Sequence, residues 1–366
     1  MLASTEKRKL SHIHIGIKED VQARRITTGF EDVFFVHRAM PSVSLQEVEV
    51  SADFFGHRLS APILIESITG GTKRALRINA ALAEAAETFG LAMGVGSQRA
   101  AVEDPSLEYT FRVVRERAPN AFLIANLGAP QLTRGYGVQE AEKAVEMIGA
   151  DALFIHTNSL QEAIQPEGET DYRGVIPKIK EIVEGVRVPV IVKETGAGIA
   201  AEDAEKMEAV GVKGVDVGGA GGTSWAAVEH FRAKQAKNRL RETLGETFWD
   251  WGIPTAASVV EVHQSTKLKV IAAGGVRSGL DVAKSIALGA DVAGLALPLL
   301  KPALKGAKQV KKTLQTAIEG FKTAMFLTGC RKLEDLKRSQ IVITGKTAEW
   351  LEARGFKPEE YARRRY

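Results

Sequence analysis

The residue best suited to chemistry in this sequence is Lys193, which closes the apolar run 188–192. A cation at the end of a buried strand is costly unless an opposite charge lies beside it. Charged groups in such places cluster at functional sites, although a structural ion pair with Glu194 or Glu162 is the alternative. We therefore expect Lys193 to belong to a site that holds an anionic ligand.

Polar residues and glycines follow the other apolar runs in the same way. Any one of them alone is explained by a solvated loop or a turn. Together they predict a ring of hydrogen-bond donors around one site. The residues at these run ends are Ser67, Thr69, Ser97, Gln98, Arg99, Asn126, His156, Asn158, Gln161, Glu162, Thr223, Gly274, Gly275, Val276, Arg277 and Ala296.

Eight apolar runs alternate with helix-like segments from about residue 61 onward. This alternation predicts a parallel sheet covered on both faces, and eight units over about 250 residues have the size of a (β/α)8 TIM barrel. An open doubly wound sheet is the competing fold, but its G-x-G-x-x-G turn is missing after the first run. The predicted strands are 61–65, 91–95, 121–125, 152–155, 188–192, 214–217, 268–272 and 291–297.

The barrel explains why the run ends matter, because barrel enzymes build their sites at the carboxyl ends of the strands. Three regions are expected: an N-terminal arm with a capping hairpin (1–60), the barrel (61–330) and a C-terminal helical tail (331–366). The hairpin is predicted at 43–49 and 53–58. Segment 218–254 is predicted to be a long loop after the sixth strand, and loops of that length are usually lids or partly disordered.

A phosphate site is expected between the seventh and eighth strands. Loops seven and eight of such barrels commonly bind phosphate through backbone N–H groups and a helix N-terminus. Gly274-Gly275 could equally form a tight turn, but Gly294 and Ala296 leave room for a ligand. With amide and hydroxyl donors on strands one to three and Lys193 on strand five, this pattern indicates FMN.

Composition is that of a soluble globular protein. Of 366 residues, 45% are hydrophobic and 26% charged, and the net charge is +4. Acidic and basic residues are interspersed, so nucleic-acid binding is not indicated, and no apolar run has the length of a membrane span. Cys330 is the single cysteine, and the N-terminus lacks the apolar core of a signal peptide. We therefore expect a cytoplasmic protein.

Several motifs resemble those of the type 2 isopentenyl-diphosphate isomerase family, over essentially the whole chain. The block from His156 to Glu162 is the most specific of them, because FMN barrels in general share the glycine motifs but not this one. The motifs are Arg8-Lys9, Thr69-Gly70-Gly71, Gly94-Val-Gly-Ser97-Gln-Arg99, Asn126-Leu-Gly, His156-Thr-Asn158-Ser-Leu-Gln161-Glu162, Lys193-Glu-Thr-Gly, Gly218-Gly-Ala-Gly-Gly-Thr223-Ser-Trp and Ala273-Gly-Gly-Val-Arg277.

The resemblance implies an isomerase that interconverts isopentenyl and dimethylallyl diphosphate with reduced FMN, Mg²⁺ and NAD(P)H as reductant. It also implies a homo-oligomer, a tetramer or larger. Lys193, Gln161 and His156 would support catalysis, with the flavin as the acid/base group and Lys193 stabilising its anionic reduced form. The metal would be bound by Glu162, and the substrate by Arg8, Lys9, Ser97, Gln98, Arg99 and Gln161. FMN would be bound by Ser67, Ile68, Thr69, Ser97, Asn126, Lys193, Thr223, Gly275, Val276, Arg277, Ala296 and Leu297.

Two other functions share part of this pattern. An FMN-dependent oxidoreductase of the 2-hydroxy-acid class would need a His base and an Arg near strands six and seven, but no histidine precedes His230 there. A phosphosugar-binding barrel without flavin would leave Lys193, Asn126 and Ser97 unexplained. The isomerase accounts for the largest number of these residues.

Overall fold

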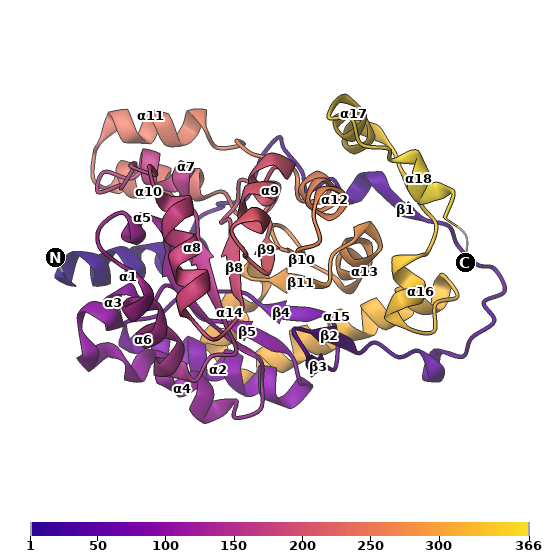
Figure 1. Ribbon diagram of the computed structural model, residues 1–366, viewed down its shortest axis with the longest axis horizontal. Helices are drawn as coiled ribbons and strands as arrows, with labels where there is room; N and C mark the ends of the chain where they lie inside the picture. Colours follow the sequence, from indigo (N-terminus) through magenta and orange to yellow (C-terminus); the bar gives the residue numbers. More distant parts are fainter. Residues whose placement is uncertain (1, 365–366) are drawn as a thin grey trace.

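Eight parallel strands close into a barrel at the centre of the computed structural model, which describes residues 2–364 (Figure 1). Each of the eight predicted runs contains or overlaps one of these strands, so the predicted barrel is confirmed and the open sheet is excluded. Around the barrel the strands are β4 (Ile63–Ile65), β5 (Ala92–Gly94), β6 (Leu123–Gly128), β7 (Ala152–His156), β8 (Val190–Lys193), β9 (Gly214–Asp216), β10 (Lys269–Ala272) and β11 (Val292–Leu295), with β11 pairing back to β4.

Amphipathic helices cover the outside of this barrel. The first, α2 (Lys73–Phe89), begins where the Thr72 side chain accepts a hydrogen bond from the Ala75 N–H, and it ends at Gly90 in the left-handed conformation. The other covering helices are α4 (Tyr109–Arg117), α6 (Val138–Ile148), α8 (Val175–Gly185), α9 (Ala201–Ala209), α12 (Thr255–Ser265), α13 (Gly279–Leu288) and α15 (Ala307–Leu327). Short helices lie in the loops: α3 (Arg99–Glu103), η3 (Pro105–Leu107), α5 (Ala129–Leu132), α7 (Ser159–Ile164) and α14 (Leu297–Lys305).

A hairpin of β2 (Ala52–Phe54) and β3 (His57–Leu59) closes the amino end of the barrel. Phe55 and Gly56 both have positive φ, as a two-residue hairpin turn requires. Phe54 and Leu59 pack into the barrel interior in one cluster with side chains of the barrel strands. The prediction of a first arm at 43–49 was wrong, because that segment holds the short helix η2 (Leu45–Glu47).

The segment after β9 is not the long loop that was predicted. Beyond its glycines it forms two helices, α10 (Trp225–Gln235) and α11 (Arg239–Thr247), which lie beside α7 at one end of the barrel (Figure 1). Its basic residues are used structurally. Arg232 bonds Glu229 and Glu167, and Arg241 donates to the carbonyl of Ala163. These contacts hold α10 and α11 against the fourth barrel loop.

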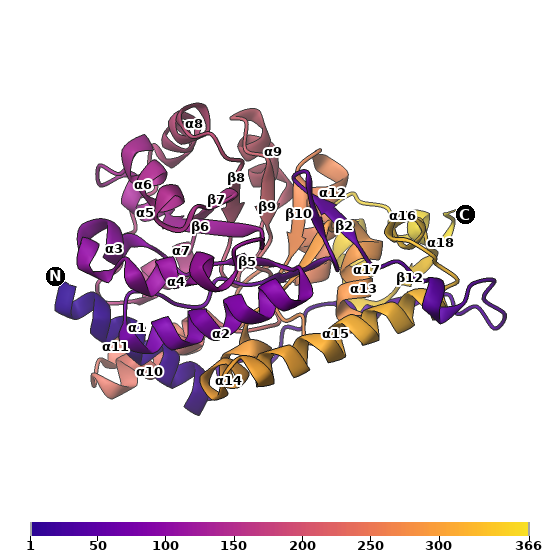
Figure 2. The same cartoon turned by 90° about the horizontal axis from the view of Figure 1, so that it is seen from below.

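The arm and the tail of the chain are joined to each other. After α1 (Leu2–Lys18) and η1 (Phe30–Asp32), β1 (Val33–Phe35) pairs antiparallel with β12 (Ile341–Ile343). The tail therefore contains a strand as well as the helices α16 (Leu333–Lys337), α17 (Gly345–Ala353) and α18 (Glu359–Ala362). Figure 2 shows α1 running beside α10 and α14. Among the described residues no helix is both long and apolar enough to cross a membrane.

Candidate active site

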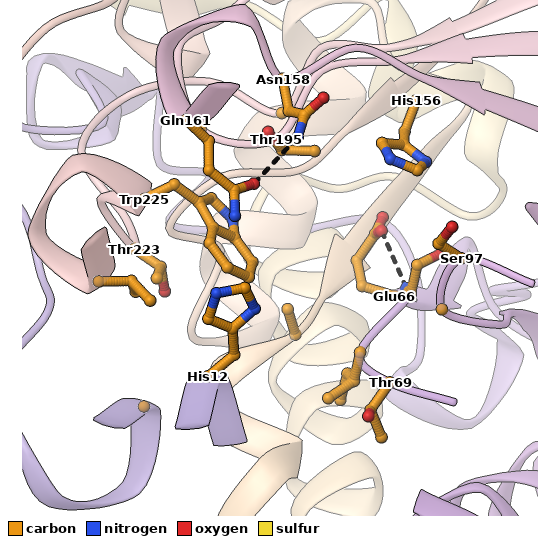
Figure 3. Close-up of a pocket in the computed structure, with 18 of the residues that line it drawn as sticks. His12, Glu66, Thr69, Ser97, His156, Asn158, Gln161, Thr195, Thr223 and Trp225 are labelled. Atoms are coloured by element: carbon orange, nitrogen blue, oxygen red, sulfur yellow. Dashed lines mark hydrogen bonds between the residues drawn. The ribbon is translucent and has the colours of Figure 1, made fainter. Parts of the chain in front are cut away.

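A cavity of about 300 Å³ opens at the carboxyl ends of the barrel strands, where α1 forms part of its wall (Figure 3). This is the size expected of a small-molecule site. The predicted site residues that line it are Arg8, Lys9, Ser67, Ile68, Thr69, Ser97, Arg99, Asn126, His156, Gln161, Glu162, Lys193, Thr223, Gly275, Arg277, Ala296 and Leu297. Gln98 and Val276 were predicted with them but do not line the cavity.

Lys193 lies at the floor of the cavity, held between two buried carboxyl groups. Its Nζ is 2.5 Å from Asp216 Oδ2 and 3.0 Å from Glu66 Oε2. The ion-pair partners suggested by the sequence, Glu194 and Glu162, were therefore wrong. Burial alone would lower the pKa of Lys193, but the charges of Asp216 and Glu66 raise it above its ordinary value. The lysine is a permanent cation in this structure.

The barrel register explains how these three side chains meet. Lys193 and Asp216 are register partners at the ends of the neighbouring strands β8 and β9. Glu66 follows β4 directly and reaches across from the opposite side of the barrel. Burial and the Glu66 carboxylate raise the pKa of Asp216 well above its ordinary value. Sequence reasoning missed both acids, although each stands at a strand end as Lys193 does.

A chain of hydrogen bonds crosses the neighbouring strand ends and fixes Asn126. The amide of Asn126 donates to Ser67 Oγ at 3.1 Å, and its Oδ1 lies 2.7 Å from His156 Nδ1. Gln98 is fully buried behind it, accepting from the Asn126 backbone N–H and donating to the carbonyl of Ala144. The predicted substrate contact of Gln98 is therefore not supported, because its side chain is turned away from the cavity. Gln98 instead holds Asn126 in place.

His156 stays neutral in this setting. Burial, followed by the positive charge of Lys193, lowers its pKa to about 4. Because Nδ1 faces a carbonyl-type oxygen of Asn126, the neutral form with its proton on Nδ1 is favoured. His156 is thus suited to orienting groups in the cavity, not to supplying positive charge at neutral pH.

The far end of the cavity, near β10 and β11, offers unpaired donors. Arg277 Nη2 is buried and has no hydrogen-bond partner among the described residues. The backbone N–H groups of Thr223 and Gly275 likewise donate to no other residue of the described chain. A Cβ at Gly222 would lie 2.3 Å from the Gly275 nitrogen, so only glycine allows the two loops to approach so closely. These donors suit a phosphate group.

Three cations gather at the opposite end of the cavity, which we term the mouth: Arg8 and Lys9 on α1, and Arg99 on α3. Lys9 Nζ donates to the carbonyl of Ser97 at 3.0 Å. Burial, then the charges of Arg8 and Arg99, lower the pKa of Lys9 to about 7. Such crowding of like charges is relieved by an anion bound between them. Arg8 and Lys9, which the resemblance implies to be substrate contacts, both line the cavity.

Glu162 is held by its own loop at the edge of the cavity. Its Oε1 accepts from Asn158 at 2.9 Å, and its Oε2 accepts from Gln165 at 2.6 Å and from the Glu169 backbone N–H at 2.7 Å. No cluster of three or more His, Cys, Asp or Glu side chains suited to a metal occurs within residues 2–364. A cation here would have Glu162 as its main protein ligand and would need further oxygens from a bound ligand.

A second network joins α1, α7 and α10 beside the cavity. The buried Glu229 carboxylate accepts from Gln161 at 3.0 Å, lies 3.0 Å from His12 Nε2, and is paired with Arg232 at 2.5 Å. Burial opposes ionisation, but these partners together lower the pKa of Glu229 below its ordinary value. Glu229 could not be found from the sequence, because it lies on a helix in a segment predicted to be a loop. Gln161 is positioned by this network.

Comparisons with known proteins decide the family. The family described as FMN-dependent dehydrogenase matches residues 3–159 and 156–343. The isopentenyl-diphosphate delta-isomerase of Methanosarcina mazei is 53% identical over 356 residues, which is 97% of each chain. This chain belongs to the FMN-dependent type 2 isopentenyl-diphosphate delta-isomerases.

Other relatives agree with membership of this family. The isopentenyl-diphosphate delta-isomerase of Archaeoglobus fulgidus is 48% identical and covers 96% of this chain and 100% of its own. Among solved structures, a flavocytochrome b2 variant with sulfite bound has a TM-score of 0.66 at 19% identity, covering 96% of this chain and 88% of its own. A mandelate oxidase variant with benzoyl-formic acid has a TM-score of 0.63 at 18% identity, covering 93% and 98%. These two structures show the fold alone.

His230, the histidine that the sequence offers near strands six and seven for a 2-hydroxy-acid oxidoreductase, does not line the cavity. His230 lies on α10, and its Nδ1 is 2.9 Å from the carbonyl of Glu242 on α11. Its ring packs against Phe231 and Trp249 instead of lining the cavity. His230 therefore cannot serve as the base that a 2-hydroxy-acid oxidoreductase needs near strands six and seven.

Proposed function

We propose that this protein interconverts isopentenyl diphosphate and dimethylallyl diphosphate with bound reduced FMN and Mg²⁺. One observation carries the proposal: the cavity has unpaired hydrogen-bond donors suited to a phosphate at one end and a cluster of three cations at the other. A flavin nucleotide and a diphosphate substrate together need two such anion sites. The isomerase name of relatives about 50% identical over nearly the whole chain supports this assignment.

The residues present fit FMN. Arg277 Nη2 and the N–H groups of Thr223 and Gly275 would bind its phosphate, with Ala296 and Leu297 at the start of α14. Ser67, Ile68, Thr69, Ser97, Asn126 and Lys193 would hold the flavin ring. Val276 would contribute through its backbone, since its side chain is buried away from the cavity. Reduced FMN supplies an acid/base group for moving protons and an electron-rich ring face.

The mouth would bind the substrate diphosphate. Arg8, Lys9 and Arg99 would pair with its oxygens, and Glu162 would hold the Mg²⁺ that neutralises part of the diphosphate charge. Moving the double bond requires a proton to be added at one carbon and another to be removed two carbons away, with no net oxidation. Gln161, held by Glu229, and the neutral His156 would orient the hydrocarbon part over the flavin. Trp225 and Leu300 give this part of the cavity apolar surface.

Further expectations accompany this proposal. NAD(P)H would reduce the flavin before turnover, and the protein would assemble as a homo-oligomer, a tetramer or larger. A cytoplasmic location and the absence of nucleic-acid and membrane partners also remain predictions. Light scattering of the purified protein tests the oligomer, and reduction of the bound flavin by NADPH in an anaerobic cuvette tests the reductant.

An anaerobic assay tests the function. Protein reconstituted with FMN should convert isopentenyl diphosphate when the flavin is reduced and Mg²⁺ is present, and it should lose at least 100-fold of this rate with oxidised flavin or with EDTA. Full activity with oxidised flavin, or protein that takes up no FMN, would reject the proposal.

Glu162→Gln tests the metal site separately. It should raise the Mg²⁺ concentration needed for half-maximal activity about tenfold or more, because a neutral amide is a weaker ligand than a carboxylate. The matched control is Glu181→Gln, which changes an exposed acid paired with Lys178 on α8. An unchanged Mg²⁺ requirement in Glu162→Gln would remove Glu162 from the metal site.

A further inference from the structure

The floor of the cavity contains two acidic side chains but only one basic side chain, so its charges do not balance if all three groups are ionised. Lys193 contributes one positive charge, whereas Glu66 and Asp216 could contribute two negative charges. The carboxyl side chains are 3% and 0% exposed, so water cannot screen the excess. Two carboxylates sharing a site do not both stay ionised when they are buried. Their burial together therefore favours one proton held by the pair.

The contacts of the two carboxyl groups show which of their oxygens already have hydrogen-bond partners. Asp216 Oδ1 accepts from the Gly218 N–H at 3.1 Å, and Glu66 Oε2 accepts from the Ser67 N–H at 3.3 Å. Glu66 Oε1 is buried with no hydrogen-bond partner among the residues described. It packs against β11 where a Cβ at Gly294 would lie only 2.1 Å away. Gly294 is thus required for Glu66 to occupy the floor.

Other charged groups near the floor do not supply the missing balance. His156, from β7, is neutral because burial and Lys193 lower its pKa to about 4. Glu194, after β8, bonds three backbone N–H groups of its own loop, and burial raises its pKa to about 7. Lys9 and Arg8 on α1 line the mouth, where they lower the pKa of His156 less than Lys193 does. The charges of Lys193, Glu66 and Asp216 must therefore balance among these three groups.

We propose that Glu66 and Asp216 share one proton beneath Lys193, so that the lysine faces the cofactor as part of a group with no net charge. This arrangement would favour an N1-protonated reduced flavin, whereas the resemblance implies an anionic one. Glu66 and Asp216 are positioning residues that act through Lys193. Either carboxyl group alone can balance the lysine, so the two are redundant in charge. The inference rests on the FMN site proposed above, but not on the isomerase activity.

Infrared spectroscopy of the holoprotein tests the shared proton directly. At neutral pH the wild type should show the C=O stretch of a protonated carboxyl group that is missing from both Glu66→Gln and Asp216→Asn, since the remaining carboxyl group is then ionised against Lys193. The control Glu169→Gln, an acid on the other side of the cavity, should retain the band. Identical bands in the wild type and both single variants would overturn the proposal, whatever the activity.

The titration of bound reduced FMN tests the consequence for the cofactor. Neutral and anionic reduced flavin differ in near-ultraviolet absorbance, so an anaerobic pH titration gives the N1 pKa. Each single variant should stay within about half a unit of the wild type, whereas the double variant Glu66→Gln/Asp216→Asn should fall by one unit or more, a tenfold change in proton dissociation.

Two results of this titration would contradict the proposal. A double variant with the wild-type N1 pKa would show that the net charge at the floor does not affect the pKa of the flavin. A single variant that shifts as far as the double would show that the carboxyl groups do not share a proton. If the double variant does not fold, the infrared comparison of the single variants decides alone. A wild type that binds no FMN refutes the cofactor site instead.

Discussion

The floor and the mouth of the cavity hold their cations in opposite ways. At the floor, Lys193 is within 3.0 Å of two carboxyl groups, and the pKa of the lysine is raised. At the mouth, Lys9 has a backbone carbonyl as its hydrogen-bond partner, and burial with two neighbouring cations lowers its pKa to about 7. The positive charge at the floor is balanced by protein carboxyl groups, whereas the positive charges at the mouth are balanced by a bound anion. The difference separates a group that adjusts a cofactor from one that captures a substrate.

Removing the cation at the floor should have the largest effect on the free energy of unfolding. Lys193→Met leaves two buried carboxyl groups without their counter-charge, and breaking a buried pair in this way costs about 3 kcal/mol. Lys9→Met at the mouth should change the free energy of unfolding by less than about 1 kcal/mol, because no carboxylate loses a close partner. Urea denaturation of the FMN-free proteins measures both. Equal losses in the two variants would erase the distinction between floor and mouth.

Substrate capture should depend on the mouth and not on the floor. Arg99→Met should weaken isopentenyl diphosphate binding about 30-fold, roughly 2 kcal/mol, with FMN affinity unchanged. The fold should survive, because Arg134 still pairs with Glu169 at 3.0 Å after Arg99 is lost. Calorimetric titration with substrate and with FMN gives both affinities. A parallel loss of FMN affinity would show that the two anion sites are not separate.

Diphosphate binding should take up a proton at the mouth. Lys9, with a pKa of about 7, is largely neutral at pH 8, and an anion beside it raises that pKa. Binding at pH 8 should therefore take up close to one proton per site, measured from the enthalpy in buffers of different ionisation heat. Lys9→Met should remove this uptake. Proton release on binding, or uptake unchanged in Lys9→Met, would contradict the assignment.

Acid stability should report the neutral state of His156. Its pKa is lowered to about 4 in the fold, so the unfolded chain binds a proton more readily below the ordinary histidine pKa of about 6.5. The stability it contributes is present above pH 6.5 and is lost as pH falls toward 4. Between pH 7 and pH 5, His156→Gln should lose about 2 kcal/mol less stability than the wild type does. Equal losses would mean that His156 protonates normally in the fold.

The sequence predicted the barrel well because each strand is a continuous apolar run at the expected spacing. Lys193, Asn126 and Gly275 were found for the same reason, since the parallel strands bring their carboxyl ends to one rim. Gln98 shows the limit of this reasoning: it stands at a strand end, but its side chain turns away from the cavity toward α6 and holds Asn126. Position along a strand does not give the direction of a side chain in the loop that follows.

The residues that were missed depend on contacts between distant parts of the chain. His12 and Glu229 are 217 positions apart and meet only because α1 packs beside α10. Segment 218–254 was predicted to be a loop because its glycines and charges hid the two helices α10 and α11. Glu66 was overlooked although it follows β4, because its neighbour Ser67 looked like the cofactor contact. Pairing of Glu66 with Lys193 requires the closed barrel, which places β4 opposite β8.

The proposed reaction is most directly tested by counting reducing equivalents against product. The holoprotein is reduced once, freed of excess reductant under anaerobic conditions, and given isopentenyl diphosphate and Mg²⁺ in D₂O. A redox-neutral isomerase should form many molecules of deuterium-labelled dimethylallyl diphosphate per flavin while the flavin stays reduced. Reoxidation of one flavin for each product formed, or product formation only with oxidised flavin, would contradict it.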